Sequence, residues 1–461
     1  MKRRDAVKLI PLSYAGIIGL QTRSYGYAQP LGLQFLATIR TLLEKIKTTR
    51  SDELLEASHR IAEAVMNGKK CYVQWDMGHS TKYDIWPERP GLPNIFVLEY
   101  PQDVEKGDII LTDCYYDDIE EHRKKGAFII SGPRPWGGDC AKSELLVPEV
   151  QRMKLRPYAD LWIDNYSDAY GAMVSVPGEI APIGPDSGVV GMMTFWMIVS
   201  DAVRLLALNG KSFTVSGDEP PLAKDNVTVD MNRPLGEVYY DTAVNQQKAI
   251  EDDFDKINRI AFMATHSVLI GGRVYVYSRY YDNLAVEGTV RRGGLGLTFG
   301  VYGPPDKLIL VDDPLQQGRI DLTFNPTDKD TIIMGIGKPD DSDDLASLDN
   351  FRKSGASISA IGPATRNWVV PQGRTVPKEV DVYCGNMCDA YGLFALPGIK
   401  RKVTPTSGLI NNQIFWAVCC QIAEQIIQRT GNAPGIYLSG ALRGGMEKLN
   451  EVKRLYKERG Y

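Results

Sequence analysis

The sequence predicts an α/β protein built from two doubly wound parallel-sheet domains that are related by an internal duplication. The plan of residues 159–208 returns at 380–429: each segment begins with a short apolar run, passes through a glycine-rich loop and ends in a long apolar stretch. Asp-Ala-Tyr-Gly stands at 168–171 and again at 389–392, and Pro-Gly, Ser-Gly and Phe-Trp pairs follow in the same order. Because each copy is typical of a strand, a loop and a helix, the repeat predicts the architecture before any single element is considered.

Weaker echoes extend the duplication toward the start of each copy. Pro-Leu-Gly at 30–32 returns at 234–236, and Lys-Cys-Tyr-Val at 70–73 returns as Arg-Val-Tyr-Val at 273–276. The chain therefore divides near residue 233 into two related halves, which we expect to form a pseudo-dimer with an approximate twofold axis.

The length of the chain agrees with this division. A sequence of 461 residues is long enough for two domains that each bury a sizeable core. We place the first domain at 30–232 and the second at 234–461. The formal net charge is −4 and the acidic and basic residues are interspersed, so we expect no basic surface for nucleic acid.

Residues 1–28 resemble a twin-arginine export signal. Arg3-Arg4 precedes a modest apolar run at 9–20, which is too short to span a bilayer, and Gly26-Tyr27-Ala28 has the small-x-Ala form of a cleavage site. We therefore expect no stable membrane span, and export of the folded protein to the periplasm or another extracytoplasmic space. The alternative is a cytoplasmic protein that keeps a basic amphipathic helix at its N-terminus.

The cysteines predict buried thiols and no metal site. Seven are present, and most of them lie within apolar strand or helix patterns. Cys384 and Cys388 have a metal-like spacing, but the chain holds only four histidines and no second close pair stands beside these cysteines. We expect neither a metal nor a cofactor, and a protein that is exported already folded requires no disulfide framework.

Two amphipathic helices open the first domain between Leu33 and Met66, because apolar residues recur there at every third or fourth position, with a polar break at 48–52. Asn67-Gly68 ends the second helix, since glycine is the usual residue past a helix end. Short apolar runs without tight hairpin patterns then predict a parallel sheet covered on both faces. The expected strands are 70–74, 95–98, 109–111, 128–130 and 161–163, with a charged helix at 117–125.

The second domain repeats this order with longer connections. Its elements are expected at 238–268 (helix), 273–277, 308–311 and 331–335 (strands), 344–353 (helix), and 357–361 and 380–383 (strands). In a doubly wound sheet the ligand crevice lies outside the carboxyl ends of the strands, where the loops after the first and third strands meet.

Several segments together resemble the sugar isomerase (SIS) domain. The paired helices lead into a strand ending in Gly78-His79-Ser80, a parallel sheet follows, and Gly184-Pro185-Asp186-Ser187-Gly188 enters the last helix. The tail, with Ala-Pro-Gly-Ile-Tyr-Leu-Ser-Gly-Ala at 433–441, Gly444-Gly445 and Asn450, resembles the end of uncharacterised SIS-domain proteins predicted to bind phosphosugars.

The resemblance covers most of residues 30–461, with one such domain in each half. It implies a flavodoxin-like fold and a sugar-phosphate ligand. In the SIS family, serine and threonine hydroxyls and backbone N–H groups after the third strand hold the phosphate. A helix N-terminus stands behind them, where unpaired N–H groups attract anions.

The corresponding loops of this chain depart from the family pattern. Thr-Asp-Cys-Tyr-Tyr-Asp-Asp at 112–118 in the first half carries carboxylates that would repel a phosphate. In the second half, the glycines at 335–342 allow close backbone approach and Lys338 supplies a positive charge, but 278–283 lacks the Gly-His-Ser of the first half. The halves thus either share complementary parts of one site or have both lost parts of it.

The candidate site residues form a catalytic pair and a ligand-binding set. His79 follows a strand and suits general acid–base chemistry, because histidine titrates near neutral pH. Glu447 lies near the start of the last helix, where it acts as a base or only complements the helix dipole. A histidine that bonds its own loop and serines that only cap helices are the structural alternatives. The ligand-binding candidates are Gly78, Ser80, Ser187, Gly337, Lys338, Ser342, Thr406 and Ser407.

We place the site at the carboxyl ends of the strands, between loop 76–80 of the first half and loop 335–342 of the second. The helix starts at Ser187 and Ser407 are expected to face it. Asp168 and Asp389, which recur in the Asp-Ala-Tyr-Gly loops, are expected to hold a backbone turn through an Asx-type bond and not to take part in chemistry.

These features predict a carbohydrate-derivative-binding protein of SIS type, with a sugar or phosphosugar as its small-molecule ligand. The first alternative is an aldose–ketose phosphosugar isomerase, and the second is a structural or interaction protein on a SIS scaffold. The altered loops favour binding over catalysis, and export favours a sugar without phosphate. The remaining partner that we expect is a second copy of the chain, in a homodimer of pseudo-dimers.

Overall fold

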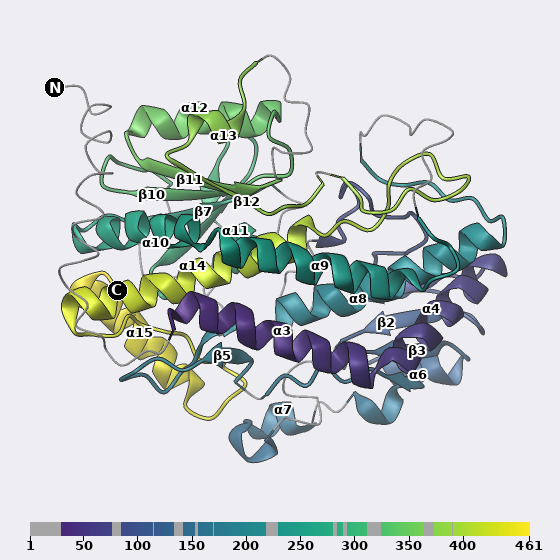
Figure 1. The fold of residues 1–461 in the computed structure, drawn as a ribbon. Coiled ribbons are helices and arrows are strands. Elements are labelled where there is room, and N and C mark those ends of the chain that lie inside the picture. Colours follow the sequence, from purple (N-terminus) through teal and green to yellow (C-terminus); the bar gives the residue numbers. More distant parts are fainter. Residues whose placement is uncertain are drawn as a thin grey trace.

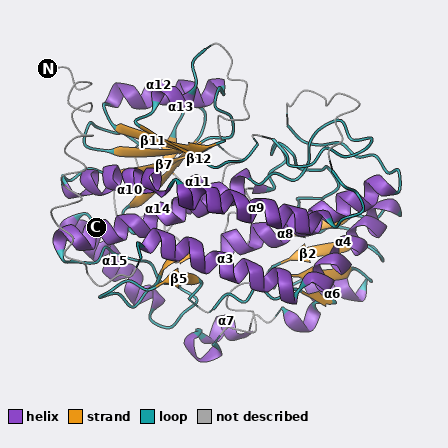
Figure 2. Ribbon diagram, in the orientation of Figure 1, coloured by secondary structure: helices purple, strands orange, loops and turns teal. Residues whose placement is uncertain are grey.

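The computed structural model describes residues 29–75, 84–113, 115–132, 142–152, 155–168, 170–217, 229–279, 284–288, 293–310, 324–363, 373–389 and 391–461. Within these residues the chain is an α/β protein with two doubly wound, mainly parallel sheets, one in each half. Figures 1 and 2 show the sheets on opposite sides of a layer of long helices. Residues 1–28, which hold the predicted export signal, lie outside the described part.

The first sheet contains four parallel strands in the order β1-β2-β3-β4. Val97 joins the other side of β1 through a single parallel bridge, so the predicted strand at 95–98 is reduced to one paired residue. Pro93 and Pro101 flank this residue, and a proline cannot donate a ladder hydrogen bond, which limits the pairing. The strands are β1 (Cys71–Gln74), β2 (Ile109–Thr112), β3 (Phe128–Ser131) and β4 (Leu161–Trp162).

The second sheet has the order β12-β11-β10-β7-β8-β9, and all pairs are parallel except β8 with β9. Numbered along the chain, the parallel strands of the two sheets lie in the same spatial order, with Val97 in the place of the second strand of the first sheet. The prediction missed β8 and took its antiparallel edge neighbour for a core strand, because glycines interrupt the apolar run that forms β8. The strands are β7 (Val274–Tyr277), β8 (Thr298–Tyr302), β9 (Ile309–Leu310), β10 (Thr331–Gly335), β11 (Ser357–Gly362) and β12 (Val382–Gly385).

Helices cover both faces of each sheet. The first half contains α3 (Leu31–Thr49), α4 (Ser51–Met66), α6 (Ile119–Lys124), α7 (Pro148–Arg152) and α8 (Ser187–Leu208), with a small antiparallel pair β5 (Ala172–Val174) and β6 (Ile183–Pro185). The second half contains α9 (Leu235–Asp252), α10 (Phe254–Leu269), α11 (Leu284–Glu287), α12 (Ser342–Ser354), α13 (Val376–Glu379), α14 (Ser407–Thr430) and α15 (Gly445–Arg459).

The paired helices at the start of the first half are confirmed as α3 and α4, and Gly68 follows them with a positive φ of 70°. The single helix predicted at 238–268 was wrong, because the chain breaks at Asp253 between α9 and α10. The acidic run at 251–253 is the counterpart of the polar break at 48–52, so the second half also begins with a helix pair.

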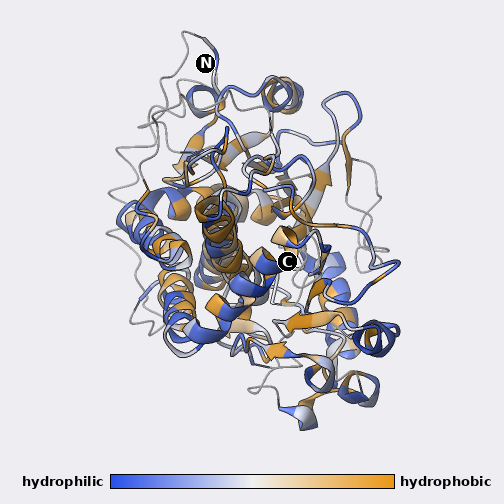
Figure 3. Cartoon of the chain, turned by 90° about the vertical axis from the view of Figure 1, so that its right-hand side faces the viewer, coloured by the Kyte–Doolittle hydropathy of each residue, from blue (hydrophilic) through white to orange (hydrophobic). Residues whose placement is uncertain are grey.

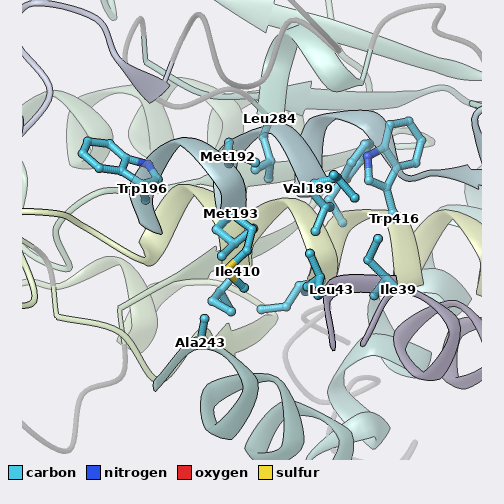
Figure 4. Packing of buried hydrophobic residues seen from close by; sticks show 14 of the residues in the cluster. Ile39, Leu43, Val189, Met192, Met193, Trp196, Ala243, Leu284, Ile410 and Trp416 are labelled. Carbon is cyan, nitrogen blue, oxygen red and sulfur yellow. The ribbon is translucent and has the colours of Figure 1, made fainter. Parts of the chain in front are cut away.

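The long helices α8 and α14 form the centre of the molecule. Their side chains belong to one hydrophobic cluster that spans both halves, and Figure 4 shows Met192, Met193 and Ile410 close together near its centre. In Figure 3 the helices at the centre are largely orange, whereas those at the rim show blue outer faces. A helix that is apolar on all sides belongs in a core. Among the described helices, α8 alone is long and apolar enough to cross a membrane, and 89% of its apolar window is buried inside the protein.

Each half contributes its first helix to the other half. The helix α3 packs on α14, and α9 packs on α8. The backbone N–H of Leu31 donates to Glu424 Oε2 of α14 at 2.8 Å, and the N–H of Leu235 donates to Asp201 Oδ1 of α8 at 2.7 Å. Carboxylates on the two central helices therefore cap the two exchanged helices, as expected for a pseudo-dimer.

Equivalent positions of the repeat share backbone geometry. Tyr166 and Met387 both have positive φ, 55° and 57°, in the turn after the last strand of each sheet. Asp168 Oδ1 accepts from the N–H of Gly171 at 3.0 Å, and Asp389 Oδ1 accepts from the N–H of Tyr391 at 3.1 Å. The Asx-type bonds predicted for the two Asp-Ala-Tyr-Gly loops are therefore confirmed.

Candidate functional site

The strand orders place a reversal point in each sheet. In the first sheet it lies between β1 and β2, because Val97 continues the sheet beyond β1 and β3 continues it beyond β2. In the second sheet it lies between β7 and β10. Ligands of doubly wound proteins bind outside the carboxyl ends of the strands at such points. We therefore describe these two edges and the junction between the halves.

At the second edge, Arg279 follows β7 and pairs with acidic residues at the start of α12. Its Nη1 lies 2.7 and 2.8 Å from the two carboxylate oxygens of Asp341, and its Nη2 lies 3.1 Å from Asp343 Oδ2. Asp341 also caps α12, since its carboxylate accepts from the backbone N–H groups of Asp343 and Asp344. The N-terminus of α12 is thus already occupied by a carboxylate of the chain itself, which a phosphate would have to displace.

The predicted ligand residues of this loop lie beside that cap. Gly337 and Lys338 follow β10, and Ser342 is the first residue of α12, where Asp341 takes the capping role. The Nζ of Lys338 lies 5.3 Å from the centre of the Tyr391 ring, so this loop contacts the second Asp-Ala-Tyr-Gly turn. The structure therefore brings Lys338 next to the segment that leads to α14.

A buried ion pair joins the two halves at the start of α14. Arg89 Nε donates to Asp84 Oδ1 at 3.0 Å, and Arg89 Nη2 donates to Ser407 Oγ at 2.8 Å. Trp196 Nε1 of α8 donates to Asp84 Oδ2 at 2.6 Å. The side chains of Asp84 and Arg89 are 0% and 3% exposed. Burial raises the pKa of Asp84, and the charge of Arg89 and the bonds from Arg89 and Trp196 oppose that shift.

The carboxylate of Asp84 reaches the helix start so closely that only glycine fits at the second position of α14. A Cβ on Gly408 would lie 1.9 Å from Asp84 Oδ1. A carboxylate is favoured at this place, because a helix N-terminus attracts negative charge. The carboxylate of Asp84, which belongs to the first half, therefore occupies the place where Ser407 and its neighbours were predicted to bind an anion.

Thr406 and its neighbours extend the polar network into the second half. Cys388 forms a hydrogen bond with Thr406, and its backbone N–H donates to Asn386 Oδ1 at 2.9 Å. Asn386 Nδ2 donates to Asn411 Oδ1 of α14 at 2.7 Å. Burial raises the pKa of the Cys388 thiol to about 12, so this group stays protonated and is a poor nucleophile.

The start of α14 lies beside the middle of α8, and whether Ser187 and Ser407 face one site stays a prediction. Ser407 is linked through Arg89 and Asp84 to Trp196, which lies about 13 Å along α8 from Ser187 by the rise of an α-helix. Figure 4 shows Trp196 and Trp416, which occupy equivalent positions of the repeat, at opposite ends of the helix contact. The start of α14 thus forms a junction with Asp84 and Arg89 of the first half.

The structure describes only one member of the predicted catalytic pair, Glu447. Gly78, His79 and Ser80 lie outside the part of the chain that the structure describes. Glu447 is exposed in the first turn of α15, and its neighbour Lys448 pairs with Glu179 at 2.5 Å. The catalytic and ligand-binding roles of these residues stay predictions.

The first edge contains buried polar groups that were not among the predicted site residues. Trp75 follows β1 and is 3% exposed, and Ser131 ends β3 and is fully buried. Within the described residues, Trp75 Nε1 and Ser131 Oγ have no hydrogen-bond partner. Asp113 and Asp164, which are also buried, follow β2 and β4. Their place directly after the predicted strands was the available signal for these residues.

Neither a metal cluster nor a disulfide is present in the described part of the chain. No group of three or more His, Cys, Asp or Glu residues there could hold a metal ion. The described cysteines are buried free thiols, as predicted, namely Cys71, Cys384, Cys388, Cys419 and Cys420.

Comparison of the sequence with protein-family models gives no match, and comparison with curated proteins gives none either. Comparison with solved structures gives matches that extend over most of this chain. Tagatose-6-phosphate ketose/aldose isomerase from Escherichia coli is 11% identical, with 88% of this chain and 97% of that chain covered and a TM-score of 0.41. The C-terminal domain of glucosamine-fructose-6-phosphate aminotransferase from Francisella tularensis is 11% identical, with 90% and 99% covered and a TM-score of 0.43.

Proposed function

We propose that this chain is a carbohydrate-derivative-binding protein whose ligand lies at the carboxyl ends of its parallel strands. The observation that supports this proposal most directly is the strand order. The order of the strands along the chain reverses once in each sheet, and polar or charged side chains follow the strands at both reversal points. The sugar class of the ligand comes from the sequence resemblance to the SIS domain.

Binding without catalysis is the form of the proposal that the contacts favour. Arg279 is committed to Asp341 and Asp343, and Ser407 is committed to Arg89. Glu447 is exposed in α15. Groups held in ion pairs or turned to solvent are poorly placed to move a proton on a bound sugar, because a general base must lie within hydrogen-bond reach of that proton.

Thermal unfolding in the presence of sugars and sugar phosphates tests the proposal. A ligand at a hundred times its dissociation constant should raise the unfolding free energy by about 2.7 kcal/mol. If the bound ligand carries a phosphate at the second edge, Lys338→Ala should weaken binding by about 1–3 kcal/mol. Lys211→Ala, at an exposed lysine after α8, is the matched control. A panel in which no sugar derivative shifts the transition would overturn the proposal.

The alternative, an aldose–ketose isomerase, has a separate test. Isomerisation through an enediol exchanges a carbon-bound hydrogen next to the carbonyl with solvent. Incubation of the protein with candidate sugars in D₂O, followed by NMR, should show no such exchange if the protein only binds. Exchange above the rate without protein would establish the isomerase instead.

Export through a twin-arginine-type signal is part of the same proposal. Arg3-Arg4 and the apolar run behind them support it. Replacement of both arginines by lysine should keep the protein in the cytoplasm, and cell fractionation with an antibody measures this. Unchanged export of that variant would remove the basis for the signal.

A further inference from the structure

We infer that removal of residues 1–28 completes the junction between the halves, because the α-amino group that it creates on Gln29 becomes the counter-ion of the buried carboxylate of Glu424. This inference rests on the export part of the proposed function and does not depend on the ligand. It is carried by a difference between the two places where an exchanged helix meets a central helix.

The start of α9 meets a pair of opposite charges on α8. The carboxylate of Asp201 accepts from the backbone N–H groups of Leu235 at 2.7 Å and of Gly236 at 3.1 Å. Arg204, one turn further along α8, has its Nε 3.0 Å from Oδ1 of the same carboxylate. The side chains of Asp201 and Arg204 are 5% and 11% exposed. The charges at this buried junction therefore cancel.

The start of α3 meets the equivalent turn of α14, where the charges do not cancel. The offset that relates the Phe-Trp pairs of α8 and α14 gives Gln421 the place of Asp201. The same offset gives Glu424 the place of Arg204. An uncharged amide thus stands where α8 has its acid, and an acid stands where α8 has its base. One negative charge is left over at this junction.

The partners of Glu424 are uncharged. The residue is 6% exposed, and its two carboxylate oxygens accept from the backbone N–H of Leu31 at 2.8 Å and from Gln428 Nε2 at 2.9 Å. Gln421 also forms a hydrogen bond with it. Among the described residues, no lysine, arginine or histidine pairs with this carboxylate. Burying a carboxylate without a counter-charge costs free energy, so the junction favours a cation.

Gln29 stands close to this carboxylate at the entry of α3. Pro30 alone separates it from Leu31, and two residues of backbone span at most about 7 Å. The nitrogen of Gln29 therefore lies within about 7 Å of the Leu31 nitrogen that donates to Glu424. Gln34 Nε2 donates to the carbonyl oxygen of Gln29 at 2.6 Å, which ties residue 29 to the helix.

Removal of residues 1–28 changes the charge at exactly one nitrogen beside Glu424. In the full-length chain the nitrogen of Gln29 is an uncharged amide, whereas a free α-amino group is mostly protonated at neutral pH. Such a cation beside a helix N-terminus is unfavourable by itself, because that end of the helix is also positive. The carboxylate of Glu424 offsets this repulsion. Processing therefore converts a surplus negative charge into an ion pair between α3 of the first half and α14 of the second.

Four proteins test the inference, namely the full-length chain and the chain that begins at residue 29, each with and without Glu424→Gln. Urea unfolding at about pH 7, where α-amino groups are protonated, gives the unfolding equilibrium constant of each. The stabilisation that accompanies removal of residues 1–28 should be about fivefold larger with the natural Glu424 than with Glu424→Gln, as for an ion pair with one exposed partner. Gln29→Ala in all four proteins prevents an N-terminal glutamine from cyclising, and the backbone carbonyl that Gln34 contacts is kept.

Two controls isolate the charge. A chain in which a short Gly-Ser extension precedes residue 29 carries its amine away from the junction, so its stability should match that of the full-length chain. Asp201→Asn removes the counterpart carboxylate, whose junction lies inside the chain, and should leave the effect of processing unchanged. A coupling to Glu424 no larger than the coupling to Asp201 would overturn the inference. Should Glu424→Gln fail to fold, equal stability of the extended chain and the chain that begins at residue 29 would overturn it as well.

Intact-mass spectrometry of the exported protein separates this inference from the proposed function. A mass that corresponds to residues 29–461 with a free amine supports the inference. A different first residue, or a Gln29 that has cyclised with loss of ammonia, overturns the inference and leaves sugar binding standing. A panel in which no sugar derivative binds overturns the proposed function and leaves the ion pair standing.

Discussion

Asp84 and Arg89 are the residues on which the junction between the halves depends. They come from the first half, and they bond to Ser407 of the second half and to Trp196 of α8. The sequence predicted Ser407 as a helix start, because Ser-Gly opens a long apolar run. It did not indicate Arg89 as its partner, because 318 positions separate the two residues and only the fold brings them together.

Asp84→Asn should destabilise the protein by about 3–5 kcal/mol, because it leaves the charge of buried Arg89 without a counter-ion. Urea unfolding measures the change. The double variant, Asp84→Asn with Arg89→Met, removes both charges. Its loss of unfolding free energy should therefore be smaller than the sum of the losses of the two single variants. Arg374→Ala, at an ion-paired arginine that is 52% exposed, should change stability little. A loss for Asp84→Asn no larger than for Arg374→Ala would contradict this account.

At the scale of elements, the Pro-Leu-Gly echo marks two places where helices cross closely. A Cβ on Gly32 would lie 2.8 Å from the carbonyl oxygen of Ala417, and a Cβ on Gly236 would lie 2.8 Å from that of Met197. Ala417 and Met197 occupy equivalent positions of α14 and α8. The repeated glycines are therefore explained by the exchange of the first helices, which the sequence pattern alone did not indicate.

Gly32→Ala and Gly236→Ala should each destabilise the protein by about 1–3 kcal/mol, because the added methyl group must push two helices apart. Differential scanning calorimetry measures both. Gly373→Ala is the control, since nothing lies within 4 Å of a Cβ at that exposed position. Equal stability of all three variants would show that the helix crossings are looser than described.

The two carboxylates that cap the exchanged helices differ in their surroundings. Asp201 has a cationic partner, with Arg204 Nε 3.0 Å from its Oδ1. Glu424 accepts from the N–H of Leu31 and from Gln428 Nε2, both uncharged donors. Burial raises the pKa of Glu424, and its hydrogen bonds oppose that shift.

Glu424→Gln should therefore become more stable relative to the natural protein as the pH rises. The raised pKa means that the folded state holds the Glu424 proton more tightly than the unfolded state does. That contribution to stability is present below the ordinary pKa of glutamate, about 4.3, and is lost as the pH rises through the raised folded value. The neutral amide has no such loss, and it still accepts from Leu31. Urea unfolding at about pH 4 and about pH 7 measures the difference, and a difference that does not change with pH would refute the account.

The sequence predicted most elements because local patterns determine them. The helix pair α3 and α4 and the strands β1, β2, β3, β7, β10 and β11 correspond to unbroken apolar or amphipathic runs. It failed where the pattern is ambiguous: the acidic break at Asp253 lies inside an otherwise helical run, and Gly300 interrupts β8. The sequence predicted residues near the site from their positions after strands and at helix starts. It could not predict which of these residues contact one another, because such contacts depend on the tertiary fold and not on a local pattern.

At the scale of the whole molecule, the exchange of α3 and α9 ties the stability of each half to the other. One hydrophobic cluster spans both halves, and neither central helix is covered without a helix from the opposite half. Large chains with two domains commonly unfold in separate steps. Here each half would expose an apolar stripe of its own central helix if the other half unfolded, and such exposure is costly.

We therefore expect the described halves to unfold in one cooperative transition. Circular dichroism reports the helices of both halves, and fluorescence reports all seven tryptophans, among them the buried Trp75 and Trp196 in the first half and Trp416 in the second. The two probes should give coincident urea transitions. Gly32→Ala and Gly236→Ala should both shift that single transition to lower urea, although the two glycines lie in different halves. Two separated transitions, each moved by only one of the substitutions, would show that the halves are independent and that the exchanged helices contribute little to holding them together.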